Sequence, residues 1–214
     1  MTFNAQTDKI AITIPSFSIK KTADHILLEE VSDLLTIQPY LVTLAIDSNG
    51  ITQKSLEFNL AEYPNTHRGD TVIMLGDGHL VYGPENPGEF VAISVLLMES
   101  DSNARDLGET LSEIVLQTQS NEFLDLANAA LNVQAQMVTK SLSTLTQVIT
   151  NRLKNEKDDF LLNTSGTFLR DMSTPYGINR QITRNNDLAE LSFKVIPLNT
   201  PNGQGATPKK ITLQ

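Results

Sequence analysis

The sequence predicts one mainly β domain over residues 1–198 that carries a helical insertion over about 103–155. Three observations lead to this prediction. Apolar and polar residues alternate in much of the chain outside the insertion, which is the period of a half-buried strand. Inside the insertion, apolar residues recur at the spacing of a helix. The chain has 214 residues, 40% of them hydrophobic, and no cysteine, so its core is large enough to need no disulfides.

The first part of the chain predicts three strands. Residues 9–20 alternate, and Pro15 is expected to break this strand or to place it at a sheet edge. Residues 40–46 predict a second strand, which ends in a turn over 47–50. Residues 52–58 alternate again and are expected to return antiparallel to the second strand. Residues 22–35 mix polar and apolar residues, as a loop or a short helix would.

The next part predicts a hairpin and a buried strand. Residues 71–75 and 79–82 are short apolar runs on either side of Gly76-Asp77-Gly78, which is the spacing of a β-hairpin. Residues 90–98, with the sequence FVAISVLLM, are the most apolar run of the chain. They predict a central strand that is buried on both faces.

The insertion predicts two helices that pack as a hairpin. Helical spacing extends over residues 105–117 and 121–153, and neither segment contains proline. The apolar stripe either packs on the sandwich and the partner helix, or forms a surface for another protein or a second copy. After the insertion, residues 160–162, 167–169 and 188–197 predict strands. The tail over 199–214 is rich in proline, glycine and threonine, and we expect it to be flexible.

The charge of the chain disfavours several partners. The net charge is −9, and residues 102–157 hold six acids and five bases, so the acidity belongs to the β part. An acidic surface repels nucleic acid and anionic lipid, and membrane binding would need a bridging cation. The N-terminus does not resemble a signal peptide, and no apolar run has the length of a membrane span. We therefore expect a soluble protein that is cytoplasmic or exported without a cleavable signal peptide.

No catalytic motif stands out. The sequence contains no phosphate-binding or dinucleotide-binding glycine pattern, no His-Glu-x-x-His and no Gly-x-Ser-x-Gly. His25, His67 and His79 are isolated from one another in polar or turn segments. We therefore expect no enzyme; a hydrolase that uses clustered carboxylates is the least favoured alternative.

Three segments share a pattern of acidic residues at strand ends. Gln38-Pro39-Tyr40-Leu41-Val42 follows a loop that holds Asp24 and Asp33. Glu99-Ser100-Asp101 ends the most apolar run. The third segment, Lys157-Asp158-Asp159-Phe160-Leu161, follows the insertion. Asp106-Leu107-Gly108 is an alternative to this third segment, and with it the pattern would close without the insertion. Together these segments resemble the C-two domain family of calcium- and phospholipid-binding domains, with Gln38 and Glu99 in the place of aspartates.

The resemblance implies a C-two-like antiparallel β-sandwich whose binding loop is expanded into an inserted α-helical hairpin. It implies a Ca²⁺ site formed by Glu99, Asp101, Asp158 and Asp159, with Asp24 and Asp33 as weaker candidates. Ca²⁺ takes six to eight oxygen ligands, which carboxylates from separate loops supply. The alternative is that these residues only cap helices and turns.

The function we expect is that of a non-enzymatic protein-interaction or assembly module. Its partner would be another protein or a second copy of the chain, contacted through the hairpin or the acidic loops. The alternative is calcium-dependent binding to an anionic lipid or surface, in which Ca²⁺ would be the cofactor.

Overall fold

The structure, a computed structural model, describes residues 2–21, 36–53, 55–100, 135–155, 158–198 and 209–212. The first sheet has the order β10-β11-β1-β6, and β7 also pairs with β1. Its strands are β1 (Lys9–Ile19), β6 (Thr71–Ile73), β7 (His79–Glu85), β10 (Gln181–Asn185) and β11 (Ala189–Leu198). The second sheet has the order β12-β4-β3-β8-β9. Its strands are β3 (Pro39–Asp47), β4 (Ser55–Glu62), β8 (Phe90–Glu99), β9 (Asp159–Leu169) and β12 (Lys209–Thr212).

Three shorter features complete the described part. Strands β2 (Thr36–Ile37) and β5 (Thr66–His67) pair with each other. Helix α1 (Ser48–Gln53) follows β3, and a 3₁₀ turn, η3 (Pro175–Gly177), follows β9. The long helix α4 (Ala135–Asn155) lies between β8 and β9 in the chain.

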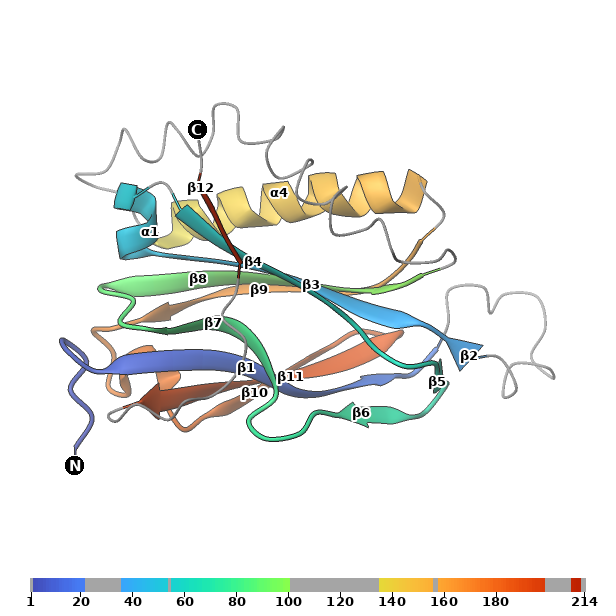
Figure 1. The fold of residues 1–214 in the computed structure, drawn as a ribbon, viewed down its shortest axis with the longest axis horizontal. Helices are drawn as coiled ribbons and strands as arrows, with labels where there is room; N and C mark the ends of the chain where they lie inside the picture. Colours follow the sequence, from blue (N-terminus) through green and yellow to red (C-terminus); the bar gives the residue numbers. More distant parts are fainter. Residues whose placement is uncertain are drawn as a thin grey trace.

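The described elements form three layers (Figure 1). The two sheets pack face to face around one apolar core, to which β1, β3, β7, β8, β9 and β11 contribute. Helix α4 covers the other face of the second sheet and forms a second core with it. The prediction of a mainly β, antiparallel fold with a helix after β8 is therefore confirmed for the described residues.

Strand β8 shows why the two cores coexist. Its alternate side chains divide between the layers: Val91, Ile93, Val95 and Leu97 face the first sheet, and Phe90, Ala92, Leu96 and Met98 face α4. A strand buried on both faces has no polar face, so its sequence is a continuous apolar run. The prediction for residues 90–98 is confirmed.

Strand β1 continues through Pro15 and lies inside its sheet, which corrects the expected break or edge position. It pairs with β11 on one side and with β6 and β7 on the other. The register shifts between Thr13 and Ser16, so Pro15 falls in an irregular step of the ladder, where a missing N–H is tolerated.

The hairpin predicted over residues 71–82 is wrong. Strands β6 and β7 both run antiparallel to β1, one after the other along the same side, and the loop 74–78 bulges out between them. The Met74 N–H donates to the Pro15 carbonyl at 2.9 Å. Gly78 has a φ of +101°, and a Cβ there would overlap the backbone of Ile14 and Pro15. Gly78 thus serves a close approach to β1 rather than a hairpin turn.

Three other expectations differ from the structure. The turn predicted over 47–50 is the start of α1, because the Asp47 carboxylate accepts the Gly50 N–H at 2.5 Å and caps the helix. Residues 160–162 and 167–169 belong to one strand, β9. Strand β10 was not predicted, since QITRN shows no apolar alternation.

The remaining expectations concern the insertion and the tail. Within the tail, Lys209–Thr212 forms β12 and pairs with β4, unlike the flexible segment expected. Of the predicted hairpin, the structure describes α4; residues 105–117 lie outside the described residues, as do 22–35.

Candidate functional site

The two ends of the insertion meet at one end of the second sheet. Glu99, the last residue of β8, lies opposite Asp159, the first residue of β9, in the antiparallel register. The Ser100 N–H donates to the Gln38 carbonyl at 3.0 Å, which holds the chain after β8 beside the beginning of β3. The register and this hydrogen bond therefore bring the end of β8, the beginning of β9 and the beginning of β3 to one rim of the sandwich.

Asp158 points into the protein at this rim. Its side chain is buried, with 2% of the residue exposed, and its Oδ2 accepts a hydrogen bond of 2.6 Å from the hydroxyl of buried Tyr40. The Asp158 N–H donates to the Leu153 carbonyl near the end of α4. Through its backbone N–H and its carboxylate, Asp158 therefore links the end of the helix to β3.

The predicted calcium ligands are brought together only in part. Glu99, Asp158 and Asp159 lie at the rim, whereas Asp24, Asp33 and Asp101 lie outside the described residues. Among residues with described positions, no group of three or more histidine, aspartate or glutamate side chains has the arrangement of a metal site. The calcium site stays a prediction.

A second buried tyrosine–carboxylate pair lies at the opposite end of β3. The Tyr82 hydroxyl donates to Asp47 Oδ2 at 2.6 Å, and both residues are buried. The nearby Glu57 carboxylate, which is also buried, accepts the Gly83 N–H at 3.1 Å. Burial, followed by the charge of Asp47, raises the pKa of Tyr82 well above its usual value. These contacts join the β7 edge of the first sheet to the second sheet.

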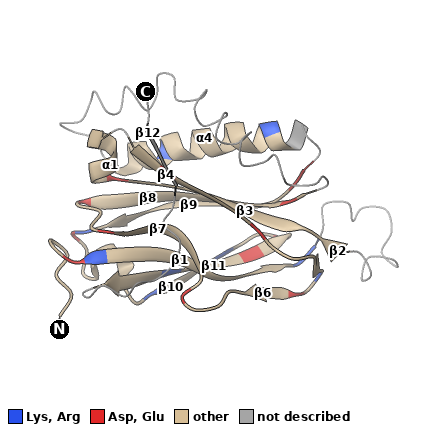
Figure 2. Cartoon of the chain, viewed as in Figure 1, with Lys and Arg blue, Asp and Glu red and all other residues tan. Residues whose placement is uncertain are grey.

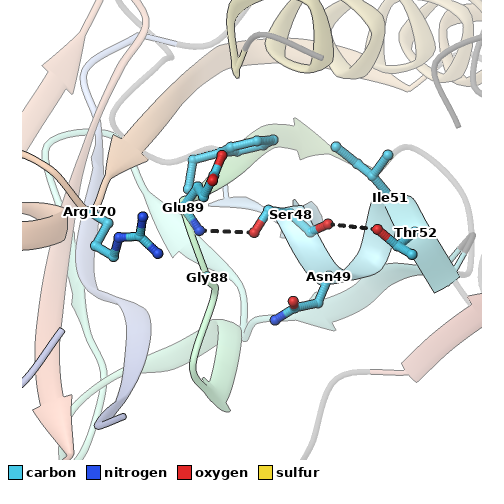
Figure 3. A pocket seen from close by; sticks show the side chains of 8 residues that line it. Ser48, Asn49, Ile51, Thr52, Gly88, Glu89 and Arg170 are labelled. Atoms are coloured by element: carbon cyan, nitrogen blue, oxygen red, sulfur yellow. Dashed lines mark hydrogen bonds between the residues drawn. The ribbon is translucent and has the colours of Figure 1, made fainter. Parts of the chain in front are cut away.

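A cavity of about 390 Å³ lies beside α1 (Figure 3). Its polar lining is largely committed to internal bonds. Ser48 Oγ donates to the Pro87 carbonyl at 2.7 Å and accepts the Glu89 N–H at 2.9 Å. Arg170 reaches in from the other side, and its Nε donates to Asp171 at 3.0 Å. That hydrogen bond lowers the pKa of Asp171. These bonds fix the chain segments around the cavity to one another.

The loop 74–78 forms a different kind of surface. Leu75, within the loop, is 97% exposed, and Ile73, just before it, is 77% exposed. The loop borders a cavity of about 270 Å³ on the outer face of the first sheet, which we call the apolar groove. The residues that line it are Ala11, Thr13, Leu75, Gly76, Asp77, Gly78, Leu80, Pro84, Ile196 and Leu198. Asp77 is paired with Lys194 at 3.3 Å, so the charged group beside the groove is neutralised.

The two histidines with described positions, His67 and His79, lie in different environments. His67, in β5, lies 3.4 Å from Asp70 at an exposed position. His79 begins β7, and burial lowers its pKa to about 4. His25 lies outside the described residues.

Two features of the structure were not predicted from the sequence: the apolar groove and the hydrogen bond of Tyr40. The run Val72-Ile73-Met74-Leu75 was interpreted as one arm of a hairpin, although four consecutive apolar residues exceed what one face of a hairpin buries. Tyr40 was noted only for its place after Gln38 and Pro39. No sequence signal indicates that it bonds Asp158, which is 118 residues away in the chain.

Comparison of the chain with protein-family models, with curated proteins and with solved structures gives no match in any of the three. The resemblance to the C-two family therefore depends on the three segments quoted above. In the parts of the chain with a described structure, no helix is long and apolar enough to cross a membrane.

Proposed function

We propose that this chain is a non-enzymatic protein-interaction module and that the loop 74–78 and the apolar groove form a contact surface. The observation that carries the proposal is the exposure of Leu75 and Ile73 next to a concave apolar lining. Single exposed leucines are common on protein surfaces, but two exposed apolar side chains close together, one of which lines a groove, are more typical of an interaction site. A partner that inserts an apolar side chain would bury both the groove and the loop.

In this proposal the helical insertion is not the contact surface; of the two roles that the sequence left open for its apolar stripe, we propose packing on the sandwich. The apolar stripe of α4 packs on the second sheet through Val138, Leu142, Leu145, Ile149 and Leu153. Burial in the protein's own core leaves this stripe unavailable to a partner. We propose that the two sheets are a C-two-like scaffold and that α4 stabilises it.

Photo-crosslinking tests the proposed surface. A photoreactive phenylalanine analogue at position 75 should form adducts with a specific protein in extracts of the source cells. The same analogue at Gln181, an exposed residue of β10, is the matched control. Untagged wild-type protein should compete for the adduct, and the Ile73→Ser, Leu75→Ser double variant should compete poorly. The same adducts at both positions, or none at position 75, would exclude this surface.

Calcium-dependent binding to an anionic surface is a second proposal. It is supported by the register that sets Glu99 opposite Asp159, with Asp158 one residue away. Metal bound to the native protein alone raises the melting temperature. Isothermal titration with millimolar Ca²⁺, repeated on Asp159→Asn, tests this. No heat and no change in melting temperature would rule the proposal out.

A further inference from the structure

The four edges of the two five-stranded sheets differ in how well they are protected against pairing with another strand. An unpaired edge presents free backbone N–H and C=O groups, and natural proteins blunt it with short strands, charges, proline or a cover. Among the described residues, the first sheet has β10 at one edge and β6 together with β7 at the other. The second sheet has β12 at one edge and β9 at the other.

Three of these edges are blunted. Strand β12 has four residues, two of them lysines, and β10 has five, including Arg184. The third edge is interrupted by the loop 74–78 and contains Pro84. Side chains from β4 also occupy backbone groups of β7: the amide of Asn59 donates to the Leu80 carbonyl at 3.2 Å, and Glu57 accepts the Gly83 N–H.

Strand β9 is the exception. It has 11 residues, and from Phe160 to Leu169 the sequence FLLNTSGTFL holds neither a charge nor a proline. In Figure 2 this strand carries no blue or red beyond its first residue. The register shift opposite Leu97 and Met98 lies near its beginning, and Asn186 donates to the Leu161 carbonyl there at 2.7 Å. From Leu162 to Leu169 the ladder with β8 is regular.

The same stretch is accessible at its centre. Ser165 is exposed, and a Cβ built at Gly166 would meet no atom within 4 Å. Leu169, at the end of the strand, is 40% exposed. Among the described residues this edge is long, regular and uncharged, and such an edge is the kind that pairs with another strand.

We propose that β9 pairs with β9 of a second copy of this chain, so that the partner of this edge is the protein itself. This inference rests on the proposed function only in that both make the chain a protein-interaction module, and it adds a specific partner and a second contact. The pairing would be antiparallel, like every strand pair among the described residues. An antiparallel pair of identical strands has a two-fold axis, so it closes as a dimer instead of growing into a fibre.

A two-fold axis at Ser165 uses the longest part of the edge. It sets Ser165 opposite Ser165 of the second copy and Asn163 opposite Thr167. The two five-stranded sheets become one continuous sheet. Helix α4 of each copy then lies on the same face of that sheet, because the axis is perpendicular to it.

Charge substitutions at Ser165 test the pairing. Light scattering after size-exclusion chromatography should give wild-type protein twice the 23.6 kDa mass of one chain. Ser165→Lys and Ser165→Glu should each raise the dimer Kd by up to about fivefold, because like charges opposite each other in a sheet repel. An equimolar mixture of the two variants should dimerise again, which shows that both fold. Asn185→Lys, at an exposed position of β10, is the control and should leave the Kd unchanged.

Amide hydrogen exchange gives a second measurement. Exchange of residues 162–169 should slow as the protein concentration rises, while exchange in β10 should not change. A wild-type protein that is monomeric at every concentration overturns the inference, as does a mixture that fails to recover the dimer. Either result leaves the adduct at position 75 as a separate test, so failure of this inference and failure of the proposed function are distinguishable.

Discussion

At the scale of single residues, the Tyr40–Asp158 bond is the clearest case of a side chain with a defined structural task. The carboxylate is buried, and the tyrosine hydroxyl donates to it at 2.6 Å. Removing one partner of a buried charged hydrogen bond costs more than the bond contributes, because the remaining group stays desolvated. The rim therefore depends on both residues.

We expect Tyr40→Phe to lower the free energy of unfolding by about 1–3 kcal/mol. A double-mutant cycle with Asp158→Asn gives the interaction energy between the two side chains. Urea denaturation measures the free energy of unfolding of each variant. A coupling energy near zero would show that the two side chains act independently. If the rim also binds Ca²⁺, Tyr40→Phe should change the Ca²⁺ affinity, since it leaves the carboxylate with one fewer donor.

His79 makes stability depend on pH. Burial lowers its pKa to about 4 in the folded protein, against about 6.5 in the unfolded chain. Between these values the unfolded chain binds more protons, so stability falls as the pH falls from about 6.5 towards 4. The full shift of the pKa from about 6.5 to about 4 corresponds to roughly 3 kcal/mol. As the pH falls over this range, the melting temperature of His79→Gln should decline less than that of wild type. If both melting temperatures decline equally, the loss of stability comes from carboxylates and not from His79.

At the scale of elements, α4 shows how a helix with few charges is stabilised. Its apolar stripe is buried on β8 and β9, and the Thr146 hydroxyl donates to Ser94 at 2.7 Å within that interface. In Figure 2 the helix carries basic residues but no acidic ones, so intrahelical ion pairs contribute little. Its stability comes from packing on the sheet.

Leu142→Ala should therefore destabilise the protein by about 2–5 kcal/mol, the usual cost of truncating a buried leucine. Leu142 is fully buried, whereas Val148 on the same helix is 38% exposed. Val148→Ala is the matched control and should change stability by less than about 1 kcal/mol. Chemical denaturation compares the two variants. Equal effects would mean that α4 is not docked on the sheet as described.

Sequence patterns predicted elements where one physical rule dominates. The buried strand β8 and helix α4 follow directly from a continuous apolar run and from helical spacing. The sequence patterns failed where strand pairing depends on distant residues. Nothing local distinguishes a hairpin from two strands that both pair with β1. The segment QITRN of β10 becomes a strand only because β11 pairs with it. Of the candidate rim, the sequence predicted the acidic residues, but the Tyr40 partner follows from tertiary structure alone.

At the scale of the whole molecule, the net charge of −9 opposes any self-association, while the β9 edge between Phe160 and Leu169 adds no charge of its own. Salt should then screen repulsion between the two copies without weakening the contact. Raising the ionic strength from about 0.02 to about 0.3 M shortens the Debye length from roughly 20 Å to roughly 6 Å, and the wild-type dimer Kd should fall. Sedimentation equilibrium measures this. The mixture of Ser165→Lys with Ser165→Glu is the control. Its dimer contains a new ion pair that salt weakens, so its Kd should not fall with salt as the wild-type Kd does. A wild-type Kd that rises with salt would mean that ion pairs hold the dimer, and that the contact lies elsewhere than at the uncharged edge.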